Sequence, residues 1–285
     1  MKVRHLIRFA LAGVACGTGD PSTSLGSESA FRSAPLDLAA IDVINPLGHM
    51  TTPFNALPQP RMYLVLRDRQ QTNPVYAPAG GLVSAIVPPN LQRVDSRIDI
   101  SVNATLTYFF DHIALESGIQ AGSRVEAGQR IARHGGNSCC VDFGLFNTAI
   151  TNFYVNARRY SSSSINADSP LRHFMEPLRS QLYAKVQRVA ADKDGRAHYD
   201  VAGRLVGNWF HEDQPVDSSM SPSAWPKQLS FAYSNTHPGM VLISVAGTLA
   251  LTNLFAADDA APDPATVTPT SGLVRYRLYQ KSPPV

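Results

Sequence analysis

Two adjacent cysteines stand directly before a strand-like run that carries one acid. The segment "HGGNSCCVDFGLFN" places Cys139 and Cys140 side by side and Asp142 two residues later. Such a pair either forms a vicinal disulfide in an oxidising compartment or keeps two thiols on opposite faces of a strand. Because side chains two apart on a strand point the same way, Cys140 and Asp142 are expected on one face.

A cysteine hydrolase is the first chemistry that these residue types suggest. Cys139 or Cys140 would act as the nucleophile and His112 as its base. A catalytic thiol normally lies at the N-terminus of a helix, which lowers its pKa. Here the cysteines lead into a strand pattern, and no helix signal lies between Gly136 and Phe146. The pattern therefore disfavours a nucleophilic thiol.

Residues 36–155 consist of short β runs broken by proline and glycine. They include "RMYLVLRD", "GGLVSAIV" and "RIDISVNATLTYFFDHI". Alternation of apolar and polar residues is clearest in the last run and indicates a strand with one apolar face. That face is expected to contain Ile98, Ile100, Val102, Ala104 and Leu106. The segment is therefore predicted to be an all-β domain.

Residues 156–195 are predicted to form a short helical connection. Ser169 before Pro170 is typical of a helix N-cap followed by proline at the first helical position. Apolar residues then recur at spacings of three and four, which indicates a helix with one buried face. Pro177 is expected to divide this stretch into two short helices.

Residues 196–285 return to short β runs such as "KQLSFAYS" and "GMVLISVAGTL". Because these runs are short and interrupted, the C-terminal β region is expected to pack on the first domain and to lack a core of its own. Trp209 and Phe210 are expected to be core residues, and stacking on a sugar or peptide is the alternative. The predicted fold class is thus mainly β.

The first residues have the layout of an export signal. "MKVRHLIRFALAGVAC" places basic residues before a short apolar run that ends in small residues at Cys16. Residues 1–16 are therefore interpreted as a signal peptide, with Cys16 as a candidate lipidation site. Residues 17–35 are small, polar and glycine-containing, as in a flexible linker. The expected location is the periplasm or outer surface, with membrane contact only through this anchor.

The overall composition indicates a globular protein. The chain has 285 residues, of which 44% are apolar, and this is enough to fill a core. Charged residues make up 16%, the net charge is +3, and the basic residues are scattered along the chain. Nothing in this pattern favours nucleic acid as a partner.

Four segments in succession give residues 36–155 a family likeness. They are "NPVYAPAGGLVSAI", "LTYFFDHI", "VEAGQRIARHGG" and "VDFGLF". Their order and spacing resemble the lysostaphin/LytM-type zinc peptidases (peptidase family M twenty-three), whose domain is a duplicated-hybrid-motif barrel. The likeness covers about 100 residues and does not extend to the C-terminal third. The third segment is also similar to biotinyl and lipoyl carrier domains, but the lysine that those domains modify is absent.

In that family, zinc is held by a His, by an Asp a few residues later and by the second His of a closing "H.H" pair. His49 in "NPLGHMTTPFN" matches the first ligand. Pro53 stands at the position of the Asp, and Asn55 is the nearest polar residue. On the closing strand, Cys140 and Asp142 stand at the positions of the two histidines, and Gly144 stands at that of a glutamate.

The resemblance implies one of two sites. In the first, His49, Asp142 and Cys140 hold zinc, His112 is catalytic, and Asn55 and Asp111 line the groove. In the second, the barrel has no metal, Cys140 packs as a small buried hydrophobe, and Asp142 is bonded to a neighbouring amide or arginine. Zinc and no cofactor are equally compatible with this sequence.

Three functions follow from these alternatives. The first is an exported cell-envelope protein whose peptidase-like domain is catalytically degenerate and acts as a binding or scaffolding module. Its partner would be peptidoglycan, a peptide or another envelope protein. The second is an active zinc-dependent endopeptidase that cleaves peptidoglycan cross-links or another peptide with a substituted ligand set. The third is an envelope structural protein in which the β regions only pack.

Overall fold

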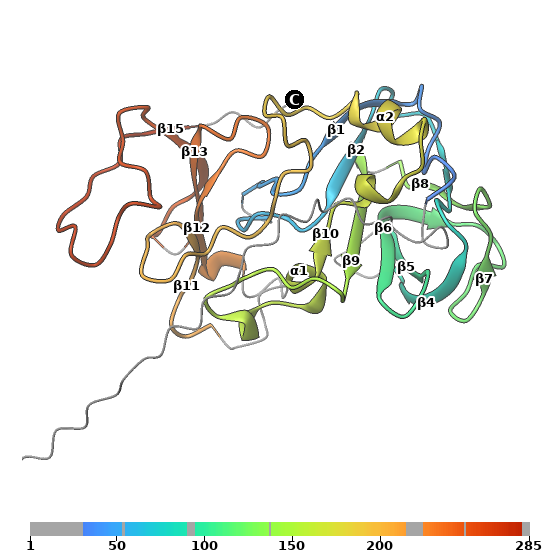
Figure 1. Cartoon of the computed structure of the whole chain (residues 1–285), viewed down its shortest axis with the longest axis horizontal. Coiled ribbons are helices and arrows are strands. Elements are labelled where there is room, and N and C mark those ends of the chain that lie inside the picture. Colours follow the sequence, from blue (N-terminus) through green and yellow to red (C-terminus); the bar gives the residue numbers. More distant parts are fainter. Residues whose placement is uncertain are drawn as a thin grey trace, which may run out of the picture.

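Two antiparallel sheets, one from each half of the chain, lie side by side in Figure 1. The computed structural model describes residues 31–52, 55–89, 95–136, 138–214, 225–247 and 249–280. The expected signal peptide, Cys16, most of the linker and Pro53 lie outside these residues. Within them, the prediction of a mainly β fold with a short helical connection and a C-terminal β region is confirmed.

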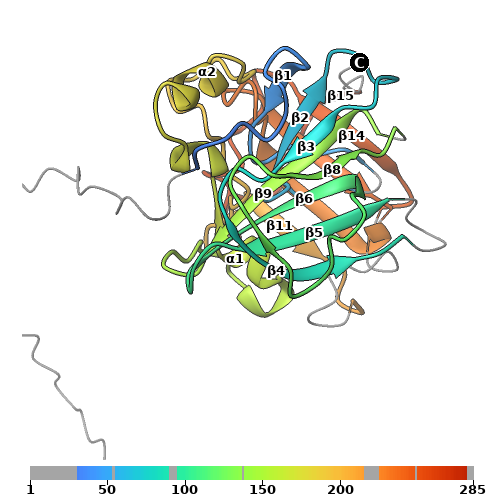
Figure 2. The same ribbon diagram turned by 90° about the vertical axis from the view of Figure 1, so that its right-hand side faces the viewer.

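The first sheet contains ten strands. They are β1 (Ile41–Asn45), β2 (Met62–Leu66), β3 (Pro74–Tyr76), β4 (Gly81–Val87), β5 (Ser96–Ser101), β6 (Leu106–Leu115), β7 (Arg124–Val125), β8 (Arg130–His134), β9 (Cys140–Asn147) and β10 (Ala167–Asp168). The main order is β1-β2-β9-β6-β5-β4-β7, with β10 beside β9 and with β8 joining β3 to β6. Figure 2 shows this sheet in front of the second one. Strand β9 is thus central, between β2 and β6.

The run predicted as one alternating strand is a hairpin. Strands β5 and β6 pair with each other, and residues 102–105 form the turn between them. The Asn103 carboxamide oxygen accepts the backbone N–H groups of Thr105 and Leu106, both at 2.9 Å. This side-chain bonding stabilises a turn that alternation alone does not reveal. Ile98 and Ile100 are buried as expected, whereas Ala104 is exposed.

Aromatic rings fill the centre of the first domain. Phe110 and Phe143 stack with centroids 4.8 Å apart, and Phe31 makes an edge contact with Tyr108 at 5.5 Å. Phe31 is fully buried, and its N–H donates to the carbonyl of His173 at 2.7 Å. The sequence pattern had placed Phe31 in the flexible linker. Among the described residues, the packed part of the chain therefore includes Phe31 and does not begin only at residue 36.

The helical connection contains four short helical segments. They are the 3₁₀ turns η1 (Ala157–Arg159) and η2 (Pro170–His173) and the helices α1 (Ser162–Ile165) and α2 (Leu178–Tyr183). The division at Pro177 is confirmed, because η2 ends before it and α2 begins after it. Ser169 occupies the N-cap position of η2 but makes no side-chain capping bond. Leu171, Phe174, Leu182 and Val186 are buried against the sheet.

The second sheet contains five strands in sequence order. They are β11 (Gly207–Phe210), β12 (Gln228–Tyr233), β13 (Val241–Ala246), β14 (Thr252–Ala257) and β15 (Leu278–Gln280), with the 3₁₀ turn η3 (Trp225–Lys227) before β12. One of its apolar clusters is completed by Met50 from the first half of the chain. The core prediction for Trp209 is wrong, because this side chain is 45% exposed.

Hydrogen bonds hold the loop that carries His49 against the second half of the chain. Asn235 Nδ2 donates to the carbonyl of Pro46 at 2.9 Å, and the hydroxyls of Thr52 and Ser244 are 2.7 Å apart. Gly48 has φ +91°, and a Cβ placed on it would lie 2.2 Å from the Arg196 carbonyl oxygen. Only glycine accommodates both this conformation and this close approach.

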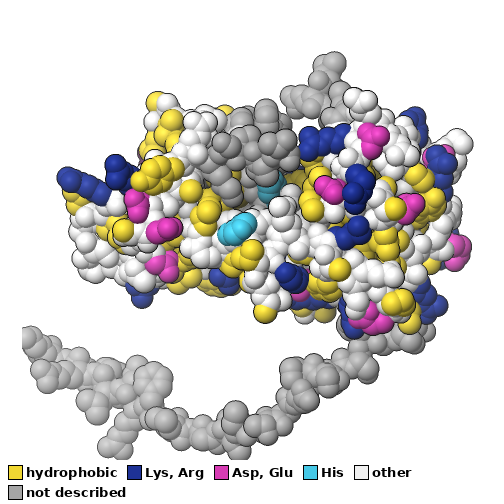
Figure 3. All heavy atoms as spheres, turned by 90° about the horizontal axis from the view of Figure 1, so that it is seen from above, with side chains coloured by type: hydrophobic (Ala, Val, Ile, Leu, Met, Phe, Trp, Pro, Cys, Tyr) yellow, Lys and Arg dark blue, Asp and Glu magenta, His cyan; other side chains and the backbone are white. Residues whose placement is uncertain are grey.

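Charged side chains of both signs are interspersed on the face of the molecule shown in Figure 3. This agrees with the scattered charge of the sequence. Among the residues that the structure describes, no helix is long and apolar enough to cross a membrane.

Gly144, which stands where the resembling peptidases have a glutamate, leaves room for an aromatic ring. Gly144 pairs across the strands with Phe109, and a Cβ on Gly144 would lie 2.1 Å from the Phe109 ring. The guanidinium of Arg97 covers the ring at 3.7 Å from its centroid. The ring therefore has little room to move away from residue 144.

We expect Gly144→Ala to lower the free energy of unfolding by about 2 kcal/mol, because the added methyl forces the Phe109 ring out of its place. Urea unfolding followed by circular dichroism measures the change. Gly239→Ala is the matched control, because nothing lies within 4 Å of a Cβ at that position. Equal stability of the two variants would contradict this packing account.

Candidate functional site

The carboxylate of Asp142 lies at the centre of the first sheet. Asp142 is only 1% exposed, and its cross-strand partners are Tyr63 on β2 and Asp111 on β6. A charged carboxylate removed from water is costly unless it is paired. The neighbours of Asp142 therefore decide what this site can do.

Arg61 supplies the positive charge. It lies immediately before β2, and its Nε is 2.6 Å from Asp142 Oδ2. Its guanidinium also lies over the Tyr63 ring, 5.6 Å from the centroid. Burial disfavours the charged guanidinium, but Tyr63 and Asp142 outweigh this, so that the pKa of Arg61 is raised. Burial also raises the pKa of Tyr63. The arginine contact expected for Asp142 in the metal-free alternative is thus present.

His112 lies where β6 changes partner. The strand pairs with β9 up to Asp111 and with β8 from Ile113 onward. At this change His112 has φ +63°, a left-handed conformation that is uncommon for residues other than glycine. Asp111 Oδ1 accepts the His112 backbone N–H at 2.7 Å. Asp111, expected to line the groove, is buried and holds this bend in the strand.

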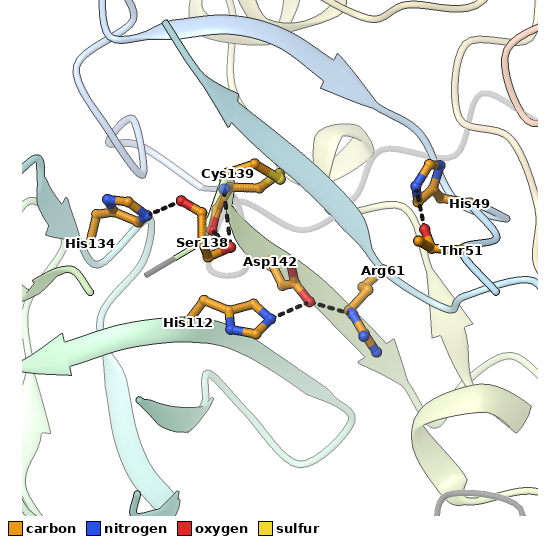
Figure 4. Close-up of a disulfide and its surroundings, with 9 residues drawn as sticks. His49, Thr51, Arg61, His112, His134, Ser138, Cys139 and Asp142 are labelled. Atoms are coloured by element: carbon orange, nitrogen blue, oxygen red, sulfur yellow. Dashed lines mark hydrogen bonds and ion pairs between the residues drawn. A yellow bond between two sulfur atoms is a disulfide. The ribbon is translucent and has the colours of Figure 1, made fainter. Parts of the chain in front are cut away.

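The bend turns the His112 side chain toward two acids. Its Nδ1 donates to Asp95 Oδ2 at 2.9 Å, and its Nε2 lies 3.7 Å from Asp142 Oδ2. The imidazole is 37% exposed, whereas Asp95 and Asp142 are buried. We call Arg61, Asp95, His112 and Asp142 the His112 site. Figure 4 shows Asp142 between His112 and Arg61.

Cys140 does not offer a thiolate in this structure. Cys139 and Cys140 form a vicinal disulfide, one of the two alternatives that the sequence allowed. The preceding turn is held by Ser138, whose carbonyl accepts His134 Nε2–H at 2.9 Å. Burial lowers the pKa of His134, which favours its neutral form. Because a disulfide sulfur is not a thiolate ligand, the expectation that Cys140 ligates zinc is corrected here.

His49 lies apart from Asp142 (Figure 4), next to Thr51, which is the backbone partner of Asn55. His49 Nε2 is 2.9 Å from the Thr51 hydroxyl, and its ring meets Tyr63 edge-on at 5.0 Å. Figure 4 shows His49 and Thr51 beyond Arg61, away from His112. Asn55 pairs with Thr51 through the backbone. The chain thus brings His112 and Asp142 together but not His49, which the same prediction placed beside them.

These residues do not fit a catalytic zinc. Such a site needs three protein ligands around one point with a fourth position open. Asp142 forms an ion pair with a guanidinium, Cys140 is in a disulfide, and His49 is directed to Thr51. A separate group, Asp95, Asp111 and His112, has ligand atoms within 4.8 Å of one another among the described residues. In that group, Asp111 accepts the His112 backbone N–H and Asp95 accepts the imidazole N–H, and these bonds orient His112.

Sequence reasoning missed Arg61, Tyr63, Asp95 and His134. Tyr63 could have been found by pairing "RMYLVL" with "CVDFGL", which places it opposite Asp142. Arg61 has no such signal, because it lies just outside a strand in a proline-containing stretch. Asp95 lies immediately before β5 and reaches His112 only through the fold.

No protein-family model and no curated protein matches the chain. Solved structures that match include Helicobacter pylori Csd3, with 17% identity, a TM-score of 0.32 and coverage of 41% of this chain and 30% of that one. A zinc-containing peptidase from Vibrio cholerae matches with 20% identity, a TM-score of 0.34 and coverage of 42% and 38%. The SpoIIQ–SpoIIIAH pore-forming complex matches with 14% identity, a TM-score of 0.38 and coverage of 54% and 96%. The chain thus spans about a third of the first two proteins.

We expect Arg61→Met and Asp142→Asn each to lower the free energy of unfolding by about 3 kcal/mol, because each leaves its partner without a counter-charge. The double variant should lose much less than the sum of the two. Chemical unfolding of all four proteins measures this coupling. Arg179→Met is the control, because its ion pair with Glu176 is exposed to solvent, and losing it should change the stability much less. Additive losses would show that the Arg61–Asp142 contact does not stabilise the fold.

Proposed function

We propose that this chain is an exported cell-envelope protein whose peptidase-like domain binds a peptide or glycan and does not hydrolyse it. The observation that carries the proposal is the contact between Arg61 and Asp142, 2.6 Å long. In the zinc peptidases that the sequence resembles, the position of Asp142 belongs to a metal ligand. Here the same position forms an ion pair with the guanidinium of Arg61.

The guanidinium and a metal ion would compete for one carboxylate. The guanidinium of Arg61 is always protonated, and its pKa is raised further here. Loss of its proton therefore cannot free the Asp142 carboxylate for a metal ion. Displacing the guanidinium would leave a second buried charge without a partner, which is strongly destabilising. This favours the degenerate form of the site over the enzyme.

His112 is the group of this site that is most available to a partner. It is more than a third exposed, while Asp95 fixes the orientation of its ring. Peptide amides and sugar hydroxyls both offer hydrogen-bond partners for an imidazole. Peptidoglycan, which carries both kinds of group, is the partner that we propose, with another envelope peptide or protein as the alternative.

The runner-up is a zinc-dependent endopeptidase with a substituted ligand set. The grouping of Asp95, Asp111 and His112 within 4.8 Å favours it, since carboxylates and imidazole are zinc ligands. It is disfavoured by the bonds that these residues already make, because Asp111 Oδ1 accepts the His112 amide and Asp95 accepts the imidazole N–H.

Binding without hydrolysis is tested with the purified protein and isolated peptidoglycan. We expect the protein to co-sediment with the polymer, and His112→Ala to weaken this about three- to tenfold, because one hydrogen-bonding group is lost. His211→Ala is the matched control, because this exposed histidine lies after β11 in the second half of the chain. Zinc content should be well below one ion per chain, and glycyl peptides should stay intact. Stoichiometric zinc together with hydrolysis would establish the endopeptidase instead.

Export and anchoring are tested separately from binding. We expect a fusion of residues 1–35 to a reporter to reach the far side of the inner membrane, since basic residues precede an apolar run that ends at Cys16. Cys16→Ala should release the reporter from the membrane fraction, because lipidation needs the thiol. A reporter that stays uncleaved in the cytoplasm would contradict export. If the unchanged fusion is cleaved and its reporter is soluble, export stands and only the lipid anchor is contradicted.

A further inference from the structure

A cavity of about 430 Å³ lies in the second half of the chain, away from the His112 site. Three segments enclose it. They are residues 155–159 at the junction of the first domain and the helical connection, residues 200–210 around β11, and residues 267–269 of the loop between β14 and β15. A cavity of this size falls within the range of small-molecule sites.

The lining of this cavity is mainly apolar and includes an exposed tryptophan. Trp209 is 45% exposed, and Val155 and Val201, also exposed, line the same cavity. The indole Nε1–H donates to the carbonyl of Leu205 at 2.8 Å. This hydrogen bond fixes the edge of the indole ring and leaves the face of the ring as a rigid surface for stacking. Exposed apolar groups that gather around a concavity are typical of a binding site.

The cavity is not built to receive another strand. β11 is an edge strand of its sheet, and such edges attract extended peptides. Here Asp200 Oδ1 accepts the Asn208 N–H at 2.9 Å, and Oδ2 accepts the Val155 N–H at 3.1 Å. The Asn208 amide is therefore already satisfied. A further strand cannot pair with this amide, and we therefore expect an occupant to enter with a side chain or as a compact molecule.

Two arginines give the cavity a positive character. Arg159 lies over the Phe210 ring, 5.0 Å from its centroid, and donates to the carbonyl of Gln214. Arg204 donates through Nη1 to the carbonyl of Thr266 at 3.2 Å. Neither forms an ion pair with any residue that the structure describes, and a guanidinium has five N–H donors. The one lining acid, Asp200, is used by backbone amides.

We propose that this cavity binds an aromatic or branched aliphatic group that carries a carboxylate. The apolar walls and the Trp209 face take the hydrocarbon part, and Arg159 or Arg204 takes the carboxylate, because guanidinium groups match carboxylate geometry. A free small acid and the C-terminal residue of a peptide share this chemistry. The inference does not depend on the function proposed for the His112 site.

Two probes that differ only in charge test the proposal. They are N-acetyl-L-phenylalanine and its amide. Trp209 and Trp225 are the two tryptophans of the chain, so Trp225→Phe leaves Trp209 as the single tryptophan, which is excited selectively over the tyrosines. We expect the acid to shift Trp209 fluorescence saturably, and the amide to bind about tenfold more weakly, because it lacks the charge that the arginines recognise.

Variants in the Trp225→Phe background assign the contacts. Arg204→Gln and Arg159→Gln should together reduce the affinity for the acid to that for the amide. Arg179→Gln, a change to an exposed arginine that does not line the cavity, should leave both affinities unchanged. Circular dichroism confirms that each variant is folded. For Trp209→Leu, calorimetry should show weaker binding of both probes, since the platform is lost.

The tripeptide Gly-Gly-Phe and its C-terminal amide distinguish the two sources of the ligand. Tighter binding of the tripeptide than of N-acetyl-phenylalanine indicates a peptide C-terminus, and tighter binding of the small acid indicates a free carboxylic acid. Equal affinity for acid and amide would overturn the proposal. So would the absence of saturable binding of either probe up to about 10 mM, a range in which even weak sites are occupied.

Discussion

The ion pair between Arg61 and Asp142 is the interaction on which the site depends. Asp142 stands on the central strand β9 with 1% exposure, so its charge has to be compensated inside the protein. Arg61 does this from the residue before β2, and Tyr63 and His112 are arranged around the same pair. With this cation in place, the Asp142 carboxylate is held in an ion pair inside the sheet, with His112 3.7 Å away.

The two halves of the chain depend on each other in a different way. The second sheet holds the loop of residues 46–52 through Asn235 and Ser244, and that loop contributes Met50 to an apolar cluster of the second half. His49 is therefore positioned by contacts outside the first domain. The same packing brings the helical connection against β11, where the cavity beside Trp209 forms.

Much of the fold could be predicted from local patterns, because the alternation of apolar residues reports burial and prolines mark where helices and strands end. The β character of both halves and the division of the helices at Pro177 are of this kind. Hydrogen bonds made by single side chains are not visible in such patterns, and Asn103 turns what looks like one strand into a hairpin. Trp209 shows a different failure. Its large apolar side chain predicts a core position, but it is partly exposed and lines a cavity.

The site was predicted in part for a similar reason. His112 and Asp142, which the family resemblance places in one site, meet because β6 pairs with β9. Arg61 and Asp95 reach them from the ends of other strands, and their positions depend on the fold rather than on any local spacing. The sequence left open whether the vicinal cysteines form a disulfide or keep two thiols, and in this structure they form a disulfide.

A crystal structure of the purified protein grown with zinc, with anomalous diffraction data measured at the zinc absorption edge, tests the central claim most directly. The account predicts Arg61 Nε in contact with Asp142 and no zinc peak within ligand distance of that carboxylate, which for oxygen is about 2.0–2.2 Å. A zinc peak bonded to Asp142 with Arg61 displaced, together with His49 or His112 as a further ligand, would contradict it.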